Sequence, residues 1–474
     1  MSATNLRTLA GHDTVIASES IEAFEATVRG PVLRPESPGY DEVREIWNAM
    51  IDRRPGLITR CAGAADVMHA VRFAREHGLL VSVRGAGHNI AGNAISDGGL
   101  LIDLSEMKSV RVDTATKSVR VEPGVTLGEL DHETQAFGLA VPVGINSTTG
   151  VAGLTLGGGF GWISRRYGMT IDNLLSADVV TAEGELRHVS ANENSDLFWG
   201  IRGGGGNFGV VTSFEFQAHE VGPMVTAGLI FHPLEAAGSV LKAWREFAAE
   251  APDELTVWVV LREAPPLPDL PVHVHGTGVI AIAALYAGDP ADGEKVLAPI
   301  RAFGDPIADL IGPAPFAGFQ SAFDPLLTPG ARNYWKSHDF IEISDELIGH
   351  VLDYADRLPS GECEIFIAQV GGAMGRVPAE ATAYTHREAN FVMNVHTRWR
   401  DATQDQECID WAREFFDKTA PHATGGVYVN FMTQDEGGRI GEAYGANYDR
   451  LVKLKKRYDP DNMFRLNQNI APDG

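Results

Sequence analysis

Residues 83–89 read Val-Arg-Gly-Ala-Gly-His-Asn and continue an apolar stretch, residues 79–83, that is typical of a buried strand. Before it, residues 64–76 carry apolar side chains at helical spacing and end before Gly78. Small residues after a strand let backbone N–H groups approach an anion such as a pyrophosphate without interference from Cβ atoms. The unit therefore predicts an anion-binding turn, although a lone Gly-x-Gly more often marks only a tight turn beside a surface histidine.

Two further glycine clusters lie at residues 157–161 and 203–209. The second formally matches the G-x-G-x-x-G pattern of dinucleotide-binding folds, but it leads into a strand-like stretch and not into a helix. The sequence also lacks the G-x-x-x-x-G-K-[ST] pattern of nucleoside triphosphatases. Three glycine clusters in one region instead indicate a long ligand that lies against backbone, and FAD is a ligand of that kind.

The charge balance of the chain bears on its partners. Lysine and arginine number 39 and aspartate and glutamate 63, so the formal charge is −24. Nucleic acids and anionic lipids require basic surface, so we expect a small-molecule partner, no nucleic acid and no membrane. The cysteines Cys61, Cys363 and Cys408 are far apart, which predicts neither a metal site nor a disulfide framework and favours the cytoplasm. The N-terminus lacks a signal-peptide pattern, and no stretch reaches 18 uncharged apolar residues.

The pattern of predicted strands and helices changes near residue 224. Before this point short alternating strands dominate, including a hairpin that turns at Glu183-Gly184. After it, longer strands alternate with amphipathic helices, which predicts a second domain of α+β type. The expected elements are residues 225–231, 234–250, 256–262, 279–286, 291–303, 345–356, 364–370, 390–399 and 405–419. Beyond Gly425, residues 427–431 predict a strand and residues 441–458 an exposed, charged helix.

The chain resembles a known flavoprotein superfamily. Residues 55–220 are similar to the FAD-binding domain of the vanillyl-alcohol-oxidase, or PCMH-type, superfamily, and the C-terminal end resembles its berberine-bridge-enzyme-like branch. The matching segments are residues 83–89, 101–107, 157–161, 167–173, 203–209, 428–431 and 444–469. The resemblance implies an α+β protein with a two-subdomain FAD-binding domain, residues 1–220 and 425–474, whose core spans about 55–220. Residues 221–424 would form a substrate-binding domain, an antiparallel sheet flanked by helices.

The resemblance also implies how the cofactor is attached. In this family the histidine of the Arg-Gly-x-Gly-His loop is the 8α attachment point for FAD, and it corresponds to His88. Many members add a second bond from a cysteine, but Asn146 stands at that position and cannot form a thioether. A single covalent link through His88 is therefore expected. Leu154 stands where the family has a histidine.

The remaining cofactor contacts are expected along the glycine clusters and the C-terminal tail. With His88, the residues that we assign to FAD binding are Arg84, Gly85, Ala86, Gly87, Asn89, Asn146, Thr148, Gly150, Gly153, Gly158, Gly159, Asn207, Gly209, Val211, Asn430 and Asn469.

Three residues are expected to take part in the reaction. The Tyr-x-Asn match points to Tyr428 as general base, although a phenol with a pKa of about 10 needs help from its surroundings to act so. A buried tyrosine that only packs a strand is the alternative. Thr149 stands where valine favours oxidases and leucine dehydrogenases in the family, and its size matches valine. Gln369 could reach into the substrate cavity from the second domain.

These observations predict a flavoprotein oxidase that transfers a hydride from an alcohol or amine carbon to flavin, with O2 reduced to H2O2. One alternative is a dehydrogenase of the same fold that uses another electron acceptor. Another is a flavin-binding protein without turnover, suggested by the absent cysteine and by Leu154. Sugars, aromatic alcohols, alkaloids and polyketide hydroxyls all remain open as substrates, and the protein is expected to be a monomer or homodimer.

Overall fold

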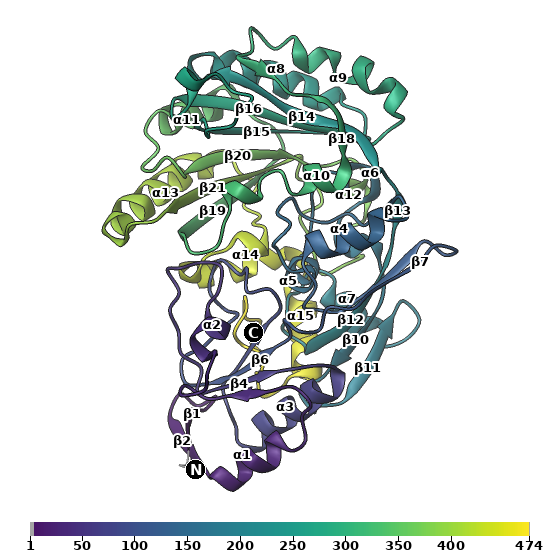
Figure 1. The fold of residues 1–474 in the computed structure, drawn as a ribbon, viewed down its shortest axis with the longest axis vertical. Coiled ribbons are helices and arrows are strands. Elements are labelled where there is room, and N and C mark those ends of the chain that lie inside the picture. The colour runs from purple at the N-terminus through teal and green to yellow at the C-terminus, as the bar shows by residue number, and fades with distance from the viewer. Residues whose placement is uncertain (1–3, 474) are drawn as a thin grey trace.

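The computed structural model describes residues 4–473, which form an α+β fold built on three main sheets (Figure 1). In the N-terminal part, a four-stranded sheet has the order β3-β4-β6-β5, and its last three strands are parallel. A β1–β2 hairpin precedes this sheet. The elements are β1 (Thr4–Arg7), β2 (Asp13–Ile16), α1 (Ser18–Glu25), β3 (Val32–Leu33), α2 (Tyr40–Arg44), β4 (Leu57–Arg60), α3 (Ala64–Glu76), β5 (Val81–Arg84) and β6 (Leu100–Asp103). The helix expected at residues 64–76 is confirmed.

A five-stranded antiparallel sheet with the order β11-β10-β12-β8-β7 forms the second part. The predicted hairpin turns at Gly184, whose φ of +70° favours glycine. Thr126 and Glu129 form a capping box that starts α4. The elements are β7 (Val110–Asp113), β8 (Ser118–Val121), α4 (Leu127–Gln135), β9 (Leu139–Ala140), α5 (Val151–Gly157), α6 (Ser164–Tyr167), β10 (Leu174–Val180), β11 (Leu186–Ser190), α7 (Ser195–Ile201), β12 (Val210–Gln217) and β13 (His219–Glu220).

An eight-stranded antiparallel sheet forms the third part, with the order β17-β14-β16-β15-β20-β21-β19 and β18 paired with β14. Helices α8, α9, α11 and α13 pack on one face, and the other face looks toward the N-terminal half (Figure 1). The elements are β14 (Met224–Pro233), α8 (Ala237–Glu250), β15 (Leu255–Glu263), β16 (Gly278–Tyr286), α9 (Gly293–Arg301), β17 (Ala308–Asp309), β18 (Gly312–Pro315), α10 (Phe316–Gln320), β19 (Arg332–Phe340), α11 (Asp345–Ala355), β20 (Glu364–Gln369), α12 (Ala373–Arg376), β21 (Phe391–Trp399) and α13 (Asp405–Thr419).

The C-terminal segment, yellow in Figure 1, returns to the N-terminal half of the chain. Leu451 and Leu454 share a hydrophobic core with Phe208 and Phe214. The single helix predicted at residues 441–458 is wrong, because the chain breaks at Gly445, whose φ is +46°. Two helices result, α14 (Ile440–Tyr444) and α15 (Tyr448–Tyr458). Among residues 4–473, no helix combines the length and the apolar character that crossing a bilayer requires.

The basic run at residues 453–457 is only partly solvated. Lys455 is fully buried, and its Nζ lies 2.6 Å from Asp459 Oδ2 and donates to the backbone oxygens of Asn207 and Phe464. This buried ion pair ties α15 to the glycine cluster at residues 203–209. The expectation of a wholly exposed charged helix is therefore wrong at this position.

Replacing Lys455 with methionine should lower the free energy of unfolding by about 3–5 kcal/mol, because the Asp459 carboxylate stays buried without its counter-charge. Lys456 is exposed on the same helix, so Lys456→Met is the matched control and should change stability little. Urea unfolding followed by fluorescence makes the comparison. Equal midpoints for the two variants would show that the buried pair contributes nothing.

Candidate active site

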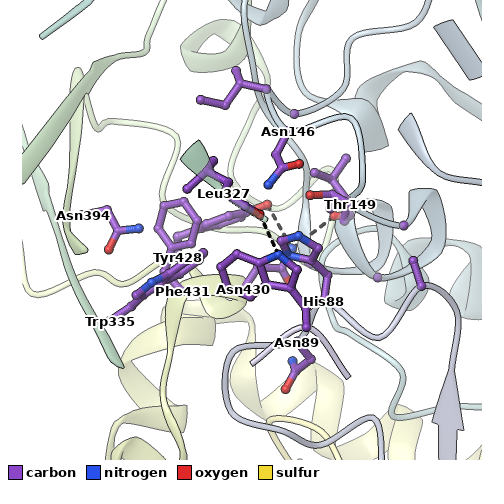
Figure 2. Close-up of a pocket in the computed structure, with 18 of the residues that line it drawn as sticks. His88, Asn89, Asn146, Thr149, Leu327, Trp335, Asn394, Tyr428, Asn430 and Phe431 are labelled. Atoms are coloured by element: carbon purple, nitrogen blue, oxygen red, sulfur yellow. Dashed lines mark hydrogen bonds between the residues drawn. The ribbon is translucent and has the colours of Figure 1, made fainter. Parts of the chain in front are cut away.

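A cavity of about 410 Å³ runs between the large sheet and the N-terminal half of the chain. Its walls come from the loop at residues 85–89, the segment 144–157, the cluster 205–211, the C-terminal tail and one face of the large sheet. Figure 2 shows part of this cavity, with His88, Thr149 and Tyr428 among the side chains around it. Segments far apart in the sequence therefore meet around one elongated space.

The groove part of the cavity is lined with backbone. Gly153 and Gly206 both face it, and a Cβ at either position would meet no protein atom within 4 Å. A side chain there would project into the open groove, so both glycines leave room for a ligand. At Gly150 the backbone passes so close to Ala86 that a Cβ would lie 3.0 Å from the Ala86 Cβ. The groove that these glycines line fits an extended ligand such as FAD.

His88 lies at the junction between the groove and the wider cavity. Its ring stacks on Trp47 with 4.3 Å between centroids, and its Nε2 lies 3.4 Å from Thr148 Oγ1. Burial, reinforced by the positive charge of Arg398, lowers the pKa of His88 to about 3. The imidazole is therefore neutral at physiological pH and keeps a nitrogen lone pair, which is the form that can act as a nucleophile.

The segment that faces His88 is held rigidly. Asn146 Oδ1 accepts hydrogen bonds from Thr148 N at 3.1 Å and from Thr148 Oγ1 at 2.8 Å. The backbone of Thr149 bonds to Asn146 and Leu127, and its side chain lines the cavity. The structure therefore places Asn146 and Thr149 in the cavity wall that faces His88, and Thr148 Oγ1 is 3.4 Å from His88 Nε2.

Tyr428 is buried at the centre of the site. Its oxygen accepts hydrogen bonds from the N–H of Gly159 and from Asn430 Nδ2, both at 3.0 Å. Burial raises the pKa of Tyr428 to about 12, although these two donors pull it downward. The phenol is therefore protonated at neutral pH, and two donors are in place to stabilise a phenolate when one forms.

Tyr428 and Asn430 meet at a turn and not on the predicted strand. A strand was expected at residues 427–431, but Val429–Phe431 is a turn of 3-10 helix. The Asn430 amide reaches Tyr428 by lying against Gly157, where a Cβ would be 2.3 Å from Asn430 Oδ1. The glycine is thus required for this contact.

Some predicted residues lie elsewhere. Gln369 does not reach the cavity, because Val257 N donates to its Oε1 and its Nε2 donates to Ala248 O in the sheet core. The expectation for Gln369 is therefore wrong. Arg84 bonds to Asp103, and Asn207 bonds to Gly204, Gln468 and Ile470, so both side chains hold the fold around the groove. Of the other assigned residues, Gly85, Ala86, Gly87, Asn89, Gly209, Val211 and Asn430 line the cavity, whereas Gly158, Gly159 and Asn469 lie outside its lining.

The large sheet contributes a polar group that was not predicted. Arg262 donates to Glu364 at 2.7 Å, and His396 Nδ1 lies 3.0 Å from the other Glu364 oxygen. Burial raises the pKa of this carboxyl, but Arg262 and His396 outweigh it and lower the pKa to about 2. Asn394 lies two residues before His396 on β21 and faces the same cavity. The polar residues at alternate positions of an otherwise apolar strand were the signal that could have found them.

Comparisons with known proteins agree with this geometry. Residues 55–190 match the model of the FAD binding domain family, and residues 427–471 match that of the berberine and berberine-like family. A FAD-linked oxidoreductase from Dictyostelium discoideum is 33% identical over 96% of this chain and 98% of its own length. (R)-6-hydroxynicotine oxidase from Paenarthrobacter nicotinovorans is 32% identical over 95% and 99%. The crystal structure of 6-hydroxy-D-nicotine oxidase from Arthrobacter nicotinovorans superimposes with a TM-score of 0.83, at 29% identity, over 94% of this chain and 98% of that one.

The two family models lie on the groove and on the segment that carries Tyr428, and the relatives extend over nearly the whole chain. The predicted fold class and family are thereby confirmed. The chain belongs to the berberine-bridge-enzyme-like family of FAD-linked oxidoreductases.

Proposed function

We propose that this FAD-dependent oxidoreductase is an oxidase that converts a small alcohol or amine to the carbonyl compound or imine. For an alcohol, the carbon loses a hydride and the hydroxyl loses a proton, so that a C=O double bond forms and O2 takes up both hydrogens as H2O2. The observation that carries the proposal is one continuous cavity lined by the glycine groove, by His88 and by Tyr428. Bound FAD would supply the hydride acceptor and the reaction with oxygen.

The residues around the groove would hold FAD along its length. Gly153 and Gly206 leave the space, and His88 offers a neutral nitrogen for a single covalent bond. Asn146 stands opposite and offers no thiol for a second bond. On this account residues 1–220 and 425–474 bind the cofactor, and residues 221–424 close the cavity from the substrate side.

Tyr428, in its phenolate form, would take the proton of the substrate hydroxyl or amine. The N–H of Gly159 and the amide of Asn430 both point at its oxygen, so they stabilise the negative charge that the phenolate carries. The alternative of a purely structural tyrosine does not explain why two donors converge on that oxygen in a cavity wall.

Thr149 is expected to leave a path for oxygen. Thr149→Leu should slow reoxidation of the reduced flavin at least about tenfold while substrate reduction of the flavin stays nearly unchanged, because the larger side chain fills the cavity beside it. Thr149→Val is the matched control and should reoxidise like the wild type. Stopped-flow mixing of the reduced protein with oxygenated buffer measures this step. If both half-reactions fall together, Thr149 shapes the substrate site instead.

The proposal is tested by incubating the purified yellow protein in air with a panel of alcohols and amines, and measuring O2 uptake and H2O2 together. One H2O2 per product molecule is expected for at least one compound. Reduction of the flavin without H2O2 would identify a dehydrogenase. A flavin that no compound reduces would indicate a binding protein without turnover.

A further inference from the structure

The face of the large sheet that looks into the cavity is mostly aromatic and aliphatic. Because side chains alternate along a strand, Ile365, Met393 and Val395 pack under the helices while their neighbours face the cavity. The apolar side chains of this sheet that line the cavity are Leu229, Phe231, Trp258, Val260, Ala281, Ala283, Trp335 and Phe366. Phe160, Trp162 and Phe431 extend this apolar lining and pack against the aromatic rings of the sheet.

Four polar side chains interrupt the apolar face of the sheet. Arg262 and His396 both bind Glu364, so the hydrogen-bonding groups of these three residues are largely used within the protein. The fourth is Asn394. Its side chain is drawn beside Trp335 at the cavity in Figure 2.

Asn394 is buried, and its side-chain oxygen is unpaired. It is 1% exposed, and its Oδ1 accepts no hydrogen bond from any residue in the described range 4–473. Its nearest strand partners are Ser337 and Phe366, neither of which bonds to the amide. A buried amide oxygen without a donor destabilises a fold, so its presence in a residue of the cavity wall points to a ligand that completes the bonds of this amide.

We propose that Asn394 binds a hydroxyl or amide group on the ring of an aromatic substrate, and that the substrate class is aromatic alcohols or amines and not saccharides. This inference rests on the proposed function. The aromatic walls suit the faces of a flat ring, and one amide offers a donor and an acceptor for one ring substituent. A saccharide presents hydroxyls all around its ring, and most of them would lose their hydrogen bonds against these walls.

The test mixes the FAD-loaded, oxidised protein with each probe in a stopped-flow instrument without oxygen. Ligand binding is read from the shift of the flavin spectrum that precedes any bleaching. The probes are the three hydroxybenzyl alcohol isomers, benzyl alcohol and D-glucose. In the wild type we expect the best hydroxy isomer to bind about tenfold more tightly than benzyl alcohol, the difference that one hydrogen bond of ordinary strength makes. In Asn394→Leu the two should bind within about twofold of each other, and D-glucose should bind most weakly to both proteins.

The same variant provides a readout that does not depend on any ligand. Asn394→Leu replaces an unpaired amide by an apolar side chain of similar volume, so the melting temperature should rise by about 1–2 °C. The matched control is Asn173→Leu, because Asn173 is also buried but donates to Tyr167 O and Met169 O. That variant should melt at a lower temperature than the wild type.

Three results would overturn the proposal: a preference for the hydroxy isomer that survives in Asn394→Leu, a melting temperature that falls as in Asn173→Leu, or D-glucose binding at least as tightly as every aromatic probe. Because these readouts need neither flavin reduction nor O2, they do not depend on whether the protein is an oxidase. A protein that binds the aromatic probes but is never reduced would refute the proposed function and leave the assignment of Asn394 standing.

Discussion

In His88→Ala, denaturation with acid is expected to release the flavin completely, whereas wild-type protein should precipitate yellow. This expectation rests on the proposed attachment at His88, since burial keeps its imidazole neutral and the opposite position is Asn146. Absorbance of the acid supernatant at the flavin maximum measures the released fraction. Asn146→Ala is the matched control from the facing wall and should keep its flavin attached.

Peptide mapping of the wild-type protein tests which residue carries the flavin. Flavin should be found on the peptide that contains His88 and on no other. Cys61, Cys363 and Cys408 are all buried, and none of them lines the cavity. Flavin on a cysteine peptide, or a wild-type flavin that acid removes, would show that the attachment is not through His88.

The second large effect concerns Tyr428. Tyr428→Phe should slow anaerobic reduction of the flavin by about 10²–10⁴-fold, the contribution typical of a positioned acid–base group. Tyr384→Phe is a matched control, because Tyr384 is buried with its ring centroid 6.4 Å from that of Tyr428 but does not line the cavity. Single-turnover reduction, normalised to bound flavin, should stay within about twofold of wild type in the control.

The pKa of Tyr428 also predicts in which direction the rate of flavin reduction changes with pH. Because the pKa of Tyr428 is raised to about 12, the phenolate fraction increases about tenfold per pH unit below that value, and the reduction rate should increase with pH. This slope should vanish in Tyr428→Phe. A loss confined to KM would make the hydroxyl a binding contact, and a lower melting temperature with normal reduction would make it structural.

Much of the groove could be predicted from local sequence. The loop at residues 85–88 follows a strand, and glycines at positions such as Gly153 and Gly206 are needed wherever backbone must approach a ligand. Long amphipathic helices such as α3 and α13 were found with their bounds, because their apolar periodicity persists over several turns.

The substrate side was harder, because its residues depend on long-range pairing. The strand β19, Arg332–Phe340, was missed because its sequence is rich in polar residues and gives no clear alternation. Gln369 is a polar residue at the end of an apolar strand, a position that would also suit a residue of the cavity wall. Only the pairing of β20 with β15 shows that its amide bonds to the sheet. Whether Asn394 has a partner depends on β19 and β20, which are far from it in the sequence.

The most direct test of the whole account is a two-step experiment on the wild-type protein. The covalently flavinylated enzyme is first mixed without oxygen with the aromatic alcohol that binds best, and is then mixed with oxygenated buffer. The account predicts full bleaching of the flavin in the first step, rapid return of its colour in the second, and one H2O2 per flavin. A flavin that no aromatic alcohol or amine bleaches, or one that stays bleached in oxygen, would contradict it.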